Sequence, residues 1–241
     1  MPAVSVRDLT FSYEGGPRVL DGLTFSIEPG EIFVIAGLSG CGKTTLCHIL
    51  NGIIPHSVKG DLGGSVEVLG SPVGSLAETA RRVGLVFQSS DEQILSTTVE
   101  DELAFGPENL CMEPVEIRRR VDAMAARLGL SHVLEKNPAL LSGGQKKLLC
   151  IGSVLILEPE ILILDEPLCN LDADGRALVR DTILSLRGEG RTVIMVEHDL
   201  ALADFADRWM LLQGGRIAGL GSPASLLEDK TLLRSLEMWF D

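Results

Sequence analysis

The sequence predicts an α/β fold, in which a largely parallel β-sheet carries helices on both faces. Three short runs are apolar at consecutive positions, as strands covered on both faces are; they are Ile32–Ala36, 83–87 and 161–164. Segments with helical periodicity alternate with these runs, which is typical of parallel sheets joined by crossover helices. The chain has 241 residues, of which 45% are hydrophobic. This is enough for a sizeable core in one large domain or two small ones.

The remaining elements are predicted from local patterns. Strands are expected at 4–13, 23–27, 65–69 and 192–196, with a hairpin over 210–217. Helices are expected over 46–50, from Ser142 to about 157, and over 176–186. From about 98 to 140, charged and apolar residues recur at helical spacing, interrupted by Pro107, Pro114 and Pro138. We interpret this stretch as a mostly helical subdomain inserted into a single domain that covers residues 1–241.

The charge and cysteine content exclude several classes of protein. Lys and Arg number 21 against 34 Asp and Glu, a net charge of −13, whereas proteins that bind phosphate backbones carry the opposite imbalance, so we expect no nucleic-acid partner. Five cysteines without C-x-x-C spacing argue against a disulfide framework or a zinc site, and for a reducing compartment. No signal peptide is visible, and the longest apolar stretch, 148–157, is shorter than the roughly 20 residues that cross a bilayer. We expect a soluble, intracellular chain whose membrane role is peripheral.

The strongest motif follows the strand Ile32–Ala36 and precedes a helix. It matches G-x-x-x-x-G-K-[ST], a loop whose backbone amides surround phosphate groups at a helix N-terminus. Lys43 would reach the β- and γ-phosphates, and the Thr44 hydroxyl would bind Mg²⁺. The alternative is a glycine turn with an incidental lysine. The residues of this loop are Gly37, Leu38, Ser39, Gly40, Cys41, Gly42, Lys43, Thr44 and Thr45.

A second motif is the acidic pair Asp165-Glu166, which directly follows four aliphatic residues. At a strand end adjacent side chains diverge, so two carboxylates can take two roles. Asp165 would bind Mg²⁺, and Glu166 would act as general base toward the attacking water. The alternative is an acidic pair that caps a helix before Pro167.

A third motif opens the helix that begins near Ser142. Ser142 is a favourable N-cap, and the glycines leave amides free to approach a ligand closely. By itself this segment could be an ordinary capped helix, but its position about twenty residues before the acidic pair is informative. The motif comprises Leu141, Ser142, Gly143, Gly144 and Gln145.

Together these motifs resemble the nucleotide-binding subunit of ATP-binding cassette (ABC) proteins, over nearly the whole chain. The resemblance implies a P-loop NTPase core with a mostly parallel sheet, an antiparallel β subdomain and an inserted α-helical subdomain. It also implies that ATP and Mg²⁺ are bound and that ATP is hydrolysed to ADP and phosphate. Two ATPase subunits, as a homodimer or a heterodimer, would sandwich two nucleotides. Ser142 and Gly144 would then act on the ATP of the partner subunit, and Asp172 matches the end of a loop that crosses between the two sites. The resemblance also places Gly143 and Gln145 among the nucleotide-binding residues.

Three further site residues come from the same resemblance. Gln88 would contact Mg²⁺ and assist catalysis, His198 would contact the γ-phosphate, and Tyr13 would stack on adenine. The alternatives are a polar loop residue for Gln88, a structural histidine at a strand end and an edge-strand aromatic ring. Some positions depart from the usual family pattern, namely Cys41 and Thr44, Lys146-Lys147-Leu148 and Cys169-Asn170. These departures bear on dimer closure and turnover, not on ATP binding.

The segments 88–95 and 98–110 resemble, more narrowly, the ATPase component of energy-coupling factor (ECF) transporters, which import vitamins or cobalt and nickel ions. This implies a place at the cytoplasmic face of the membrane. It also implies a transmembrane coupling subunit that contacts the chain near Gln88–Pro107, and a separate substrate-binding membrane subunit. One alternative is the ATPase of a generic ABC importer. Another is a non-transport ABC ATPase that acts on nucleic acid or ribosomes, and a metabolic kinase would leave the Ser142 motif and His198 without a role.

Overall fold

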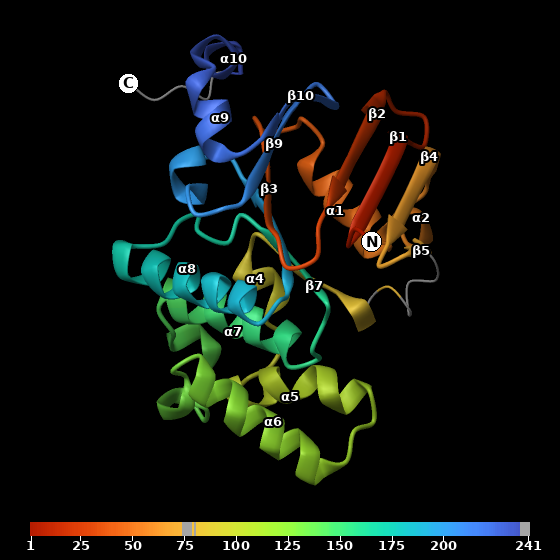
Figure 1. The fold of residues 1–241 in the computed structure, drawn as a ribbon. Helices are drawn as coiled ribbons and strands as arrows, with labels where there is room; N and C mark the ends of the chain where they lie inside the picture. Colours follow the sequence, from red (N-terminus) through yellow and green to blue (C-terminus); the bar gives the residue numbers. More distant parts are fainter. Residues whose placement is uncertain (74–78, 80, 237–241) are drawn as a thin grey trace.

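A six-stranded sheet forms the centre of the computed structural model, which describes residues 1–73, 79 and 81–236 (Figure 1). Five neighbouring strands are parallel and β10, at one edge, is antiparallel to β9. This confirms the predicted α/β class. The strands, in their order across the sheet, are β10 (Arg216–Gly221), β9 (Arg208–Gln213), β3 (Ile32–Ala36), β8 (Thr192–Glu197), β7 (Ile161–Asp165) and β6 (Val83–Val86).

The second sheet has four strands, all antiparallel, and lies toward the upper right of Figure 1. It corresponds to the antiparallel subdomain that the family resemblance implies. Its strands, in spatial order, are β2 (Arg18–Ile27), β1 (Val4–Tyr13), β4 (Gly60–Val68) and β5 (Ser71–Pro72).

The central strand β3 shows how the two faces of the parallel sheet are covered. All five of its residues are buried, and they alternate between two hydrophobic clusters. Ile32 and Val34 face the cluster beneath the helices α7 and α8, whereas Phe33 and Ile35 face the cluster shared with the antiparallel sheet and α1. This two-sided burial explains why the strand is apolar at every position.

The helices occupy distinct places around the sheets. In Figure 1, α5 and α6 lie at the bottom, farthest from the antiparallel sheet, with α7 and α8 between them and the central strands. No described helix is both long and apolar enough to span a bilayer. The α-helices are α1 (Lys43–Asn51), α2 (Ile53–His56), α4 (Ser90–Gln93), α5 (Val99–Asn109), α6 (Pro114–Arg127), α7 (Gly143–Leu155), α8 (Ala173–Gly188), α9 (Pro223–Glu228) and α10 (Lys230–Ser235); short 3-10 helices cover Ser131–Val133, Pro138–Leu140 and Leu200–Ala203.

The predicted interruption at Pro107 is wrong, because Pro107 lies inside α5. It is the ninth of eleven helical residues, and its missing N–H removes one helical hydrogen bond, while the Leu110 amide still donates to the Gly106 carbonyl in the last turn. Pro114 and Pro138 do begin helices, where the missing N–H is tolerated. The extent of an inserted subdomain at about 98–140 stays a prediction.

Candidate functional site

The loop between β3 and α1 is tightly curled around its glycines. Gly40 and Gly42 adopt positive φ angles of 79° and 107°, a region that side-chain-bearing residues rarely adopt. A Cβ at Gly37 would collide with the Leu212 carbonyl oxygen and lie 2.7 Å from Cys41 Sγ. Glycine is therefore favoured at Gly40 and Gly42 by backbone conformation and at Gly37 by lack of space, as a loop that approaches phosphate closely needs.

Lys43 is the first residue of α1, and its side chain turns back into this loop. The ammonium donates to the carbonyl oxygens of Gly37 at 2.6 Å and Leu38 at 3.1 Å, and the residue is buried. No side chain caps the N-terminus of α1, whose first N–H groups lack helical acceptors and carry partial positive charge. An ammonium, uncapped amides and a glycine-lined concavity fit a phosphate group.

Thr44 and Asp165 bring two oxygen donors together beside this loop. The Thr44 hydroxyl donates to Asp165 Oδ2 at 3.2 Å. Burial raises the pKa of Asp165 above its usual value, and the hydrogen bond from Thr44 opposes this shift. A cation would offset the burial of the carboxylate, and hydroxyl and carboxylate oxygens are hard ligands, so the pair fits Mg²⁺.

Glu166 lies immediately beyond β7 with φ at +46°, a backbone conformation that is uncommon for a residue with a side chain. Its Oε2 accepts a hydrogen bond from Gln88 Nε2 at 2.8 Å and lies 3.4 Å from His198 Nδ1. Strands β7 and β8 are parallel neighbours, so the residues after them, Glu166 and His198, meet at one edge of the sheet. The two adjacent carboxylates thus have different surroundings, as expected for different roles.

Tyr13 ends β1 next to the phosphate loop. Its hydroxyl is 2.9 Å from Thr45 Oγ1, and its ring meets the Phe11 ring edge-on at a centroid distance of 5.0 Å. The residue remains 38% exposed, so it is accessible to a ligand. Stacking on adenine stays a prediction.

The Ser142 motif begins α7 as a reciprocal cap. Ser142 Oγ accepts from the Gln145 amide at 3.3 Å, and Gln145 Oε1 accepts from the Ser142 amide at 3.1 Å. Asp172 caps α8 in a similar way by accepting from the Gly175 amide at 2.8 Å. A Cβ at Gly144 would lie 2.7 Å from Gly175 Cα, so the two helices approach each other closely at their starts.

These two helix starts form a group separate from the phosphate loop. In the described part of the chain, no hydrogen bond joins Ser142, Gly143, Gly144, Gln145 or Asp172 to the loop residues 37–45. The structure therefore brings together Lys43, Thr44, Asp165, Glu166, Gln88 and His198 along one edge of the sheet, with Tyr13 beside the loop.

Comparison with known proteins tests the origin of this arrangement. The family model described as ABC transporter matches residues 20–169. The chain belongs to this family. It is 44% identical over 228 residues to a putative ABC transporter ATP-binding protein of Methanosarcina mazei, covering 92% of this chain but only 39% of that relative. The chain thus spans well under half the length of this relative.

Relatives of similar length carry more specific names. The energy-coupling factor transporter ATP-binding protein EcfA of Methanocaldococcus jannaschii is 35% identical, over 99% of this chain and 85% of the relative. The cobalt import ATP-binding protein CbiO of Rhodobacter capsulatus is 37% identical, over 96% and 83%. The solved structure of cbiO1 from Clostridium perfringens, part of the ABC transporter complex cbiONQ, matches with a TM-score of 0.86 and 32% identity, covering 98% of this chain and 95% of that one. The resemblance to ABC and ECF-type ATP-binding subunits is confirmed.

Sequence reasoning missed two buried ionisable residues of this ABC domain. Lys147 is 3% exposed and donates to the carbonyl oxygens of Phe87 at 3.2 Å and Gln88 at 2.8 Å; burial lowers the pKa of this lysine. Glu197 is completely buried, and burial raises its pKa to about 8. The signal for each was a charge directly beside an apolar run: Lys147 precedes 148–151, and Glu197 follows 193–196.

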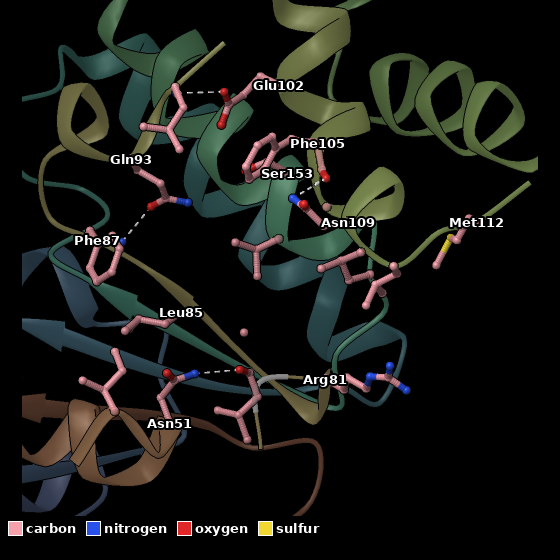
Figure 2. A pocket seen from close by; sticks show the side chains of 18 residues that line it. Asn51, Arg81, Leu85, Phe87, Gln93, Glu102, Phe105, Asn109, Met112 and Ser153 are labelled. Carbon is pink, nitrogen blue, oxygen red and sulfur yellow. Dashed lines mark hydrogen bonds between the residues drawn. The ribbon is translucent and has the colours of Figure 1, made fainter. Parts of the chain in front are cut away.

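A large cavity lies apart from the phosphate loop. It has a volume of about 860 Å³ and is bounded by β6, α5 and α7. In Figure 2, Leu85 and Phe87 face Phe105 and Ser153 across it. Glu102 holds the segment before α5, because its Oε2 accepts from the amides of Leu95 and Ser96, each at 2.9 Å. Gln93 joins the rim to α7 by accepting from the Phe87 amide and donating to the Cys150 carbonyl.

Proposed function

We propose that this chain is the ATP-binding and ATP-hydrolysing subunit of an ABC importer, of the ECF type, that takes up a vitamin or a transition-metal ion. One observation carries the proposal: a phosphate-binding loop, two oxygen donors for Mg²⁺ and a hydrogen-bonded carboxylate converge on one edge of the sheet. The names of the relatives support the transport role and the class of cargo.

Each side chain has a distinct task in hydrolysis. Lys43 would exchange its two carbonyl acceptors for the β- and γ-phosphate oxygens of ATP. Thr44 and Asp165, with Gln88, would hold Mg²⁺, which supplies charge neutralisation at the phosphate oxygens when bound. Glu166 would accept a proton from the attacking water, and its present hydrogen bond from Gln88 keeps it aimed at this position.

His198 completes the catalytic group. Its Nδ1 faces Glu166 and its side chain is 47% exposed, so the imidazole is accessible to an incoming γ-phosphate. Contact of His198 with the phosphate would link the end of β8 to the state of the nucleotide.

The separate group at the starts of α7 and α8 requires a second ATPase subunit. In our proposal Ser142, Gly144 and Asp172 contact ATP that is held by the loop of another copy or of a sister chain. Among the described residues, no hydrogen bond joins this group to the phosphate loop of its own chain, and this supports an action in trans. ATP would thus close the pair, and hydrolysis would reopen it.

The cavity beside β6 is the proposed contact for the transmembrane coupling subunit, near Gln88–Pro107. Its rim carries exposed apolar side chains, with Leu95 at 70%, Phe105 at 47% and Phe87 at 40% exposure. Lys147 and Gln93 connect this rim to α7, the helix that begins at Ser142. Movement at the nucleotide would reach the membrane partner by this route, and a separate membrane subunit would bind the cargo. The chain would act peripherally at the cytoplasmic face of the membrane.

Substitutions of Glu166 and of Lys43 test ATP hydrolysis and ATP binding separately. Glu166→Gln should retain ATP binding in calorimetry, lose about 10²- to 10⁴-fold in turnover and accumulate an ATP-bound dimer in size-exclusion chromatography. Lys43→Ala should lose tight ATP binding. Glu160→Gln, at an exposed residue just before β7 and at the opposite end of that strand from Glu166, is the control. Undiminished turnover in Glu166→Gln, or unchanged affinity in Lys43→Ala, would contradict the assignment.

The membrane contact is tested at the cavity rim. Phe105→Glu should leave the ATPase activity of the isolated chain unchanged but prevent co-purification with membrane subunits from detergent extracts. Leu178→Glu places the same change at a 51% exposed residue of α8 and should retain them. Equal recovery with both variants would remove the cavity from the interface, and recovery of ribosomes or nucleic acid instead would overturn the transport role.

A further inference from the structure

Three chemically different side chains gather beside the catalytic edge: Glu166, Cys169 and His198. One ligand atom from each, a carboxylate oxygen, Cys169 Sγ and an imidazole nitrogen, lies within 4.8 Å of the other two. Among residues 1–73, 79 and 81–236, this is the group of three His, Cys, Asp or Glu side chains that meets this distance. We refer to it as the Glu–Cys–His cluster.

The fold creates this cluster from segments that are distant in sequence. Glu166 follows β7 and His198 follows β8, and these strands are parallel neighbours. The backbone then turns back, with the Cys169 amide donating to the Glu166 carbonyl at 3.4 Å. The turn returns the Cys169 thiol to the side of the sheet edge that carries the carboxylate and the imidazole.

The donor set is suited to a borderline or soft divalent cation. Thiolate and imidazole favour Zn²⁺, Co²⁺ and related ions, whereas Mg²⁺ prefers six oxygen ligands. Three protein ligands and an open fourth position are the pattern of an accessible zinc site. Bond lengths of about 2.0–2.3 Å to zinc place donors in a tetrahedral site roughly 3.3–3.8 Å apart. Glu166 Oε2 and His198 Nδ1, 3.4 Å apart, already have this spacing. Since the three ligand atoms lie within 4.8 Å of one another, any contraction needed is at most about 1.5 Å.

The exposure of the cluster allows this contraction and the entry of an ion. His198 is 47% exposed in its side chain, and Glu166 is 15% exposed. Cys169 is half-buried and forms no disulfide. The cluster shares no residue with Thr44, Gln88 or Asp165, the residues assigned to Mg²⁺, although Glu166 is hydrogen-bonded to Gln88. A second cation can therefore bind without displacing the Mg²⁺ ligands.

We propose that the Glu–Cys–His cluster binds a Zn²⁺-class divalent cation and that this binding inhibits ATP hydrolysis. A cation coordinated by Glu166 engages the oxygen lone pairs that would accept the proton from water, and it also fixes His198 away from an incoming γ-phosphate. The inhibition rests on the proposed roles of Glu166 and His198 in ATP hydrolysis, whereas the binding of the cation does not. Cys169 supplies the selectivity for soft ions.

Direct binding is tested with Cd²⁺, whose thiolate complexes absorb in the ultraviolet, on reduced full-length protein without nucleotide or added thiol. One equivalent should give a thiolate-to-Cd²⁺ charge-transfer band, and calorimetry should give the affinity. Loss of even a hydrogen-bond partner of a metal ligand costs about 10- to 100-fold in affinity, so Cys169→Ala should weaken binding by at least about 100-fold. The exposed Cys111 provides the control: Cys111→Ala should bind as the wild type does.

Two outcomes would overturn the binding site. One is the absence of the band in the wild type, and the other is equal Cd²⁺ affinity in Cys169→Ala. His198→Ala provides a second test should Cys169→Ala fold poorly, because it should also lose the ion while retaining the thiol. Both readouts are independent of whether the protein hydrolyses ATP.

Inhibition is tested separately with Zn²⁺ in an ATPase assay at saturating Mg²⁺. Stoichiometric Zn²⁺ should suppress the wild-type rate, and a chelator should restore it. At the same Zn²⁺ concentration Cys169→Ala should keep its rate, whereas Cys111→Ala should be suppressed as the wild type is. Equal suppression in Cys169→Ala, or a wild type that binds Cd²⁺ but is not inhibited by Zn²⁺, would refute the inhibitory role.

Discussion

Glu197 offers a quantitative test of the electrostatics beneath the catalytic edge. The residue is fully buried, and only one of its oxygens has a partner, the Leu168 amide at 3.3 Å. Burial raises its pKa from 4.5 to about 8. Between these two values the folded protein retains a proton that the unfolded chain has released, so stability falls as pH rises. The slope is about 1.4 kcal/mol per pH unit, which amounts to about 3 kcal/mol at pH 7.

Glu197→Gln should remove this penalty, because the amide is neutral in both states and keeps the acceptor for Leu168. We expect the variant to exceed the wild type by about 1 kcal/mol at pH 5 and by about 3 kcal/mol at pH 7. Urea unfolding, followed by circular dichroism at half-unit pH steps from 5 to 8, measures both profiles.

Glu116 provides the matched control. It lies partly exposed at the surface, and hydrogen bonds from Arg119 and Arg120 lower its pKa to about 2. It is therefore ionised in both states throughout this pH range, and Glu116→Gln should leave the slope unchanged. A wild-type slope that persists in Glu197→Gln would refute the reasoning, because another group would then carry the pH dependence.

Three further changes test packing and capping. Gly144→Ala should destabilise the fold by about 1–3 kcal/mol in thermal melts, because its Cβ would meet Gly175, whereas Gly143→Ala, with its nearest contact at 3.4 Å, should cost less; equal losses would contradict this. Glu102→Ala should cost about 2 kcal/mol in urea unfolding, since two amides lose their acceptor, and should speed hydrogen exchange at residues 95 and 96; unchanged exchange would argue against this anchor. Thr98→Ala removes a cap on α5 and should cost about 1 kcal/mol by the same unfolding assay, with no loss if solvent caps the helix equally well.

The parallel sheet was predictable because burial on both faces leaves a strong pattern. Strands β3 and β7 are buried at every position; the sequence of β3 is apolar throughout, and that of β7 is apolar up to its last residue, Asp165. The strand boundaries of the antiparallel sheet are harder to predict from the sequence, because its strands are exposed on one face. Strand β2 begins at Arg18 rather than at residue 23, and β4 begins at Gly60 and includes glycines that disfavour strands. Pairing with β1 determines these boundaries.

The candidate site was predictable where a motif is continuous. Lys43 and Thr44 follow from the loop pattern alone. The meeting of Cys169 with His198 was not, because it depends on β7 and β8 being neighbours, and strand order is not encoded in local spacing. Lys147 was missed for a related reason: a lysine in a helix normally faces solvent, and only the tertiary structure shows the carbonyl groups that it meets.

The glycine-to-glycine approach of α7 and α8 has a mechanical consequence. With no side chain between Gly144 and Gly175, the backbones of the two helices lie in direct contact here, so a movement of one helix toward the other is passed on to its neighbour. The loops that precede α7 and α8 should then move together rather than independently of each other.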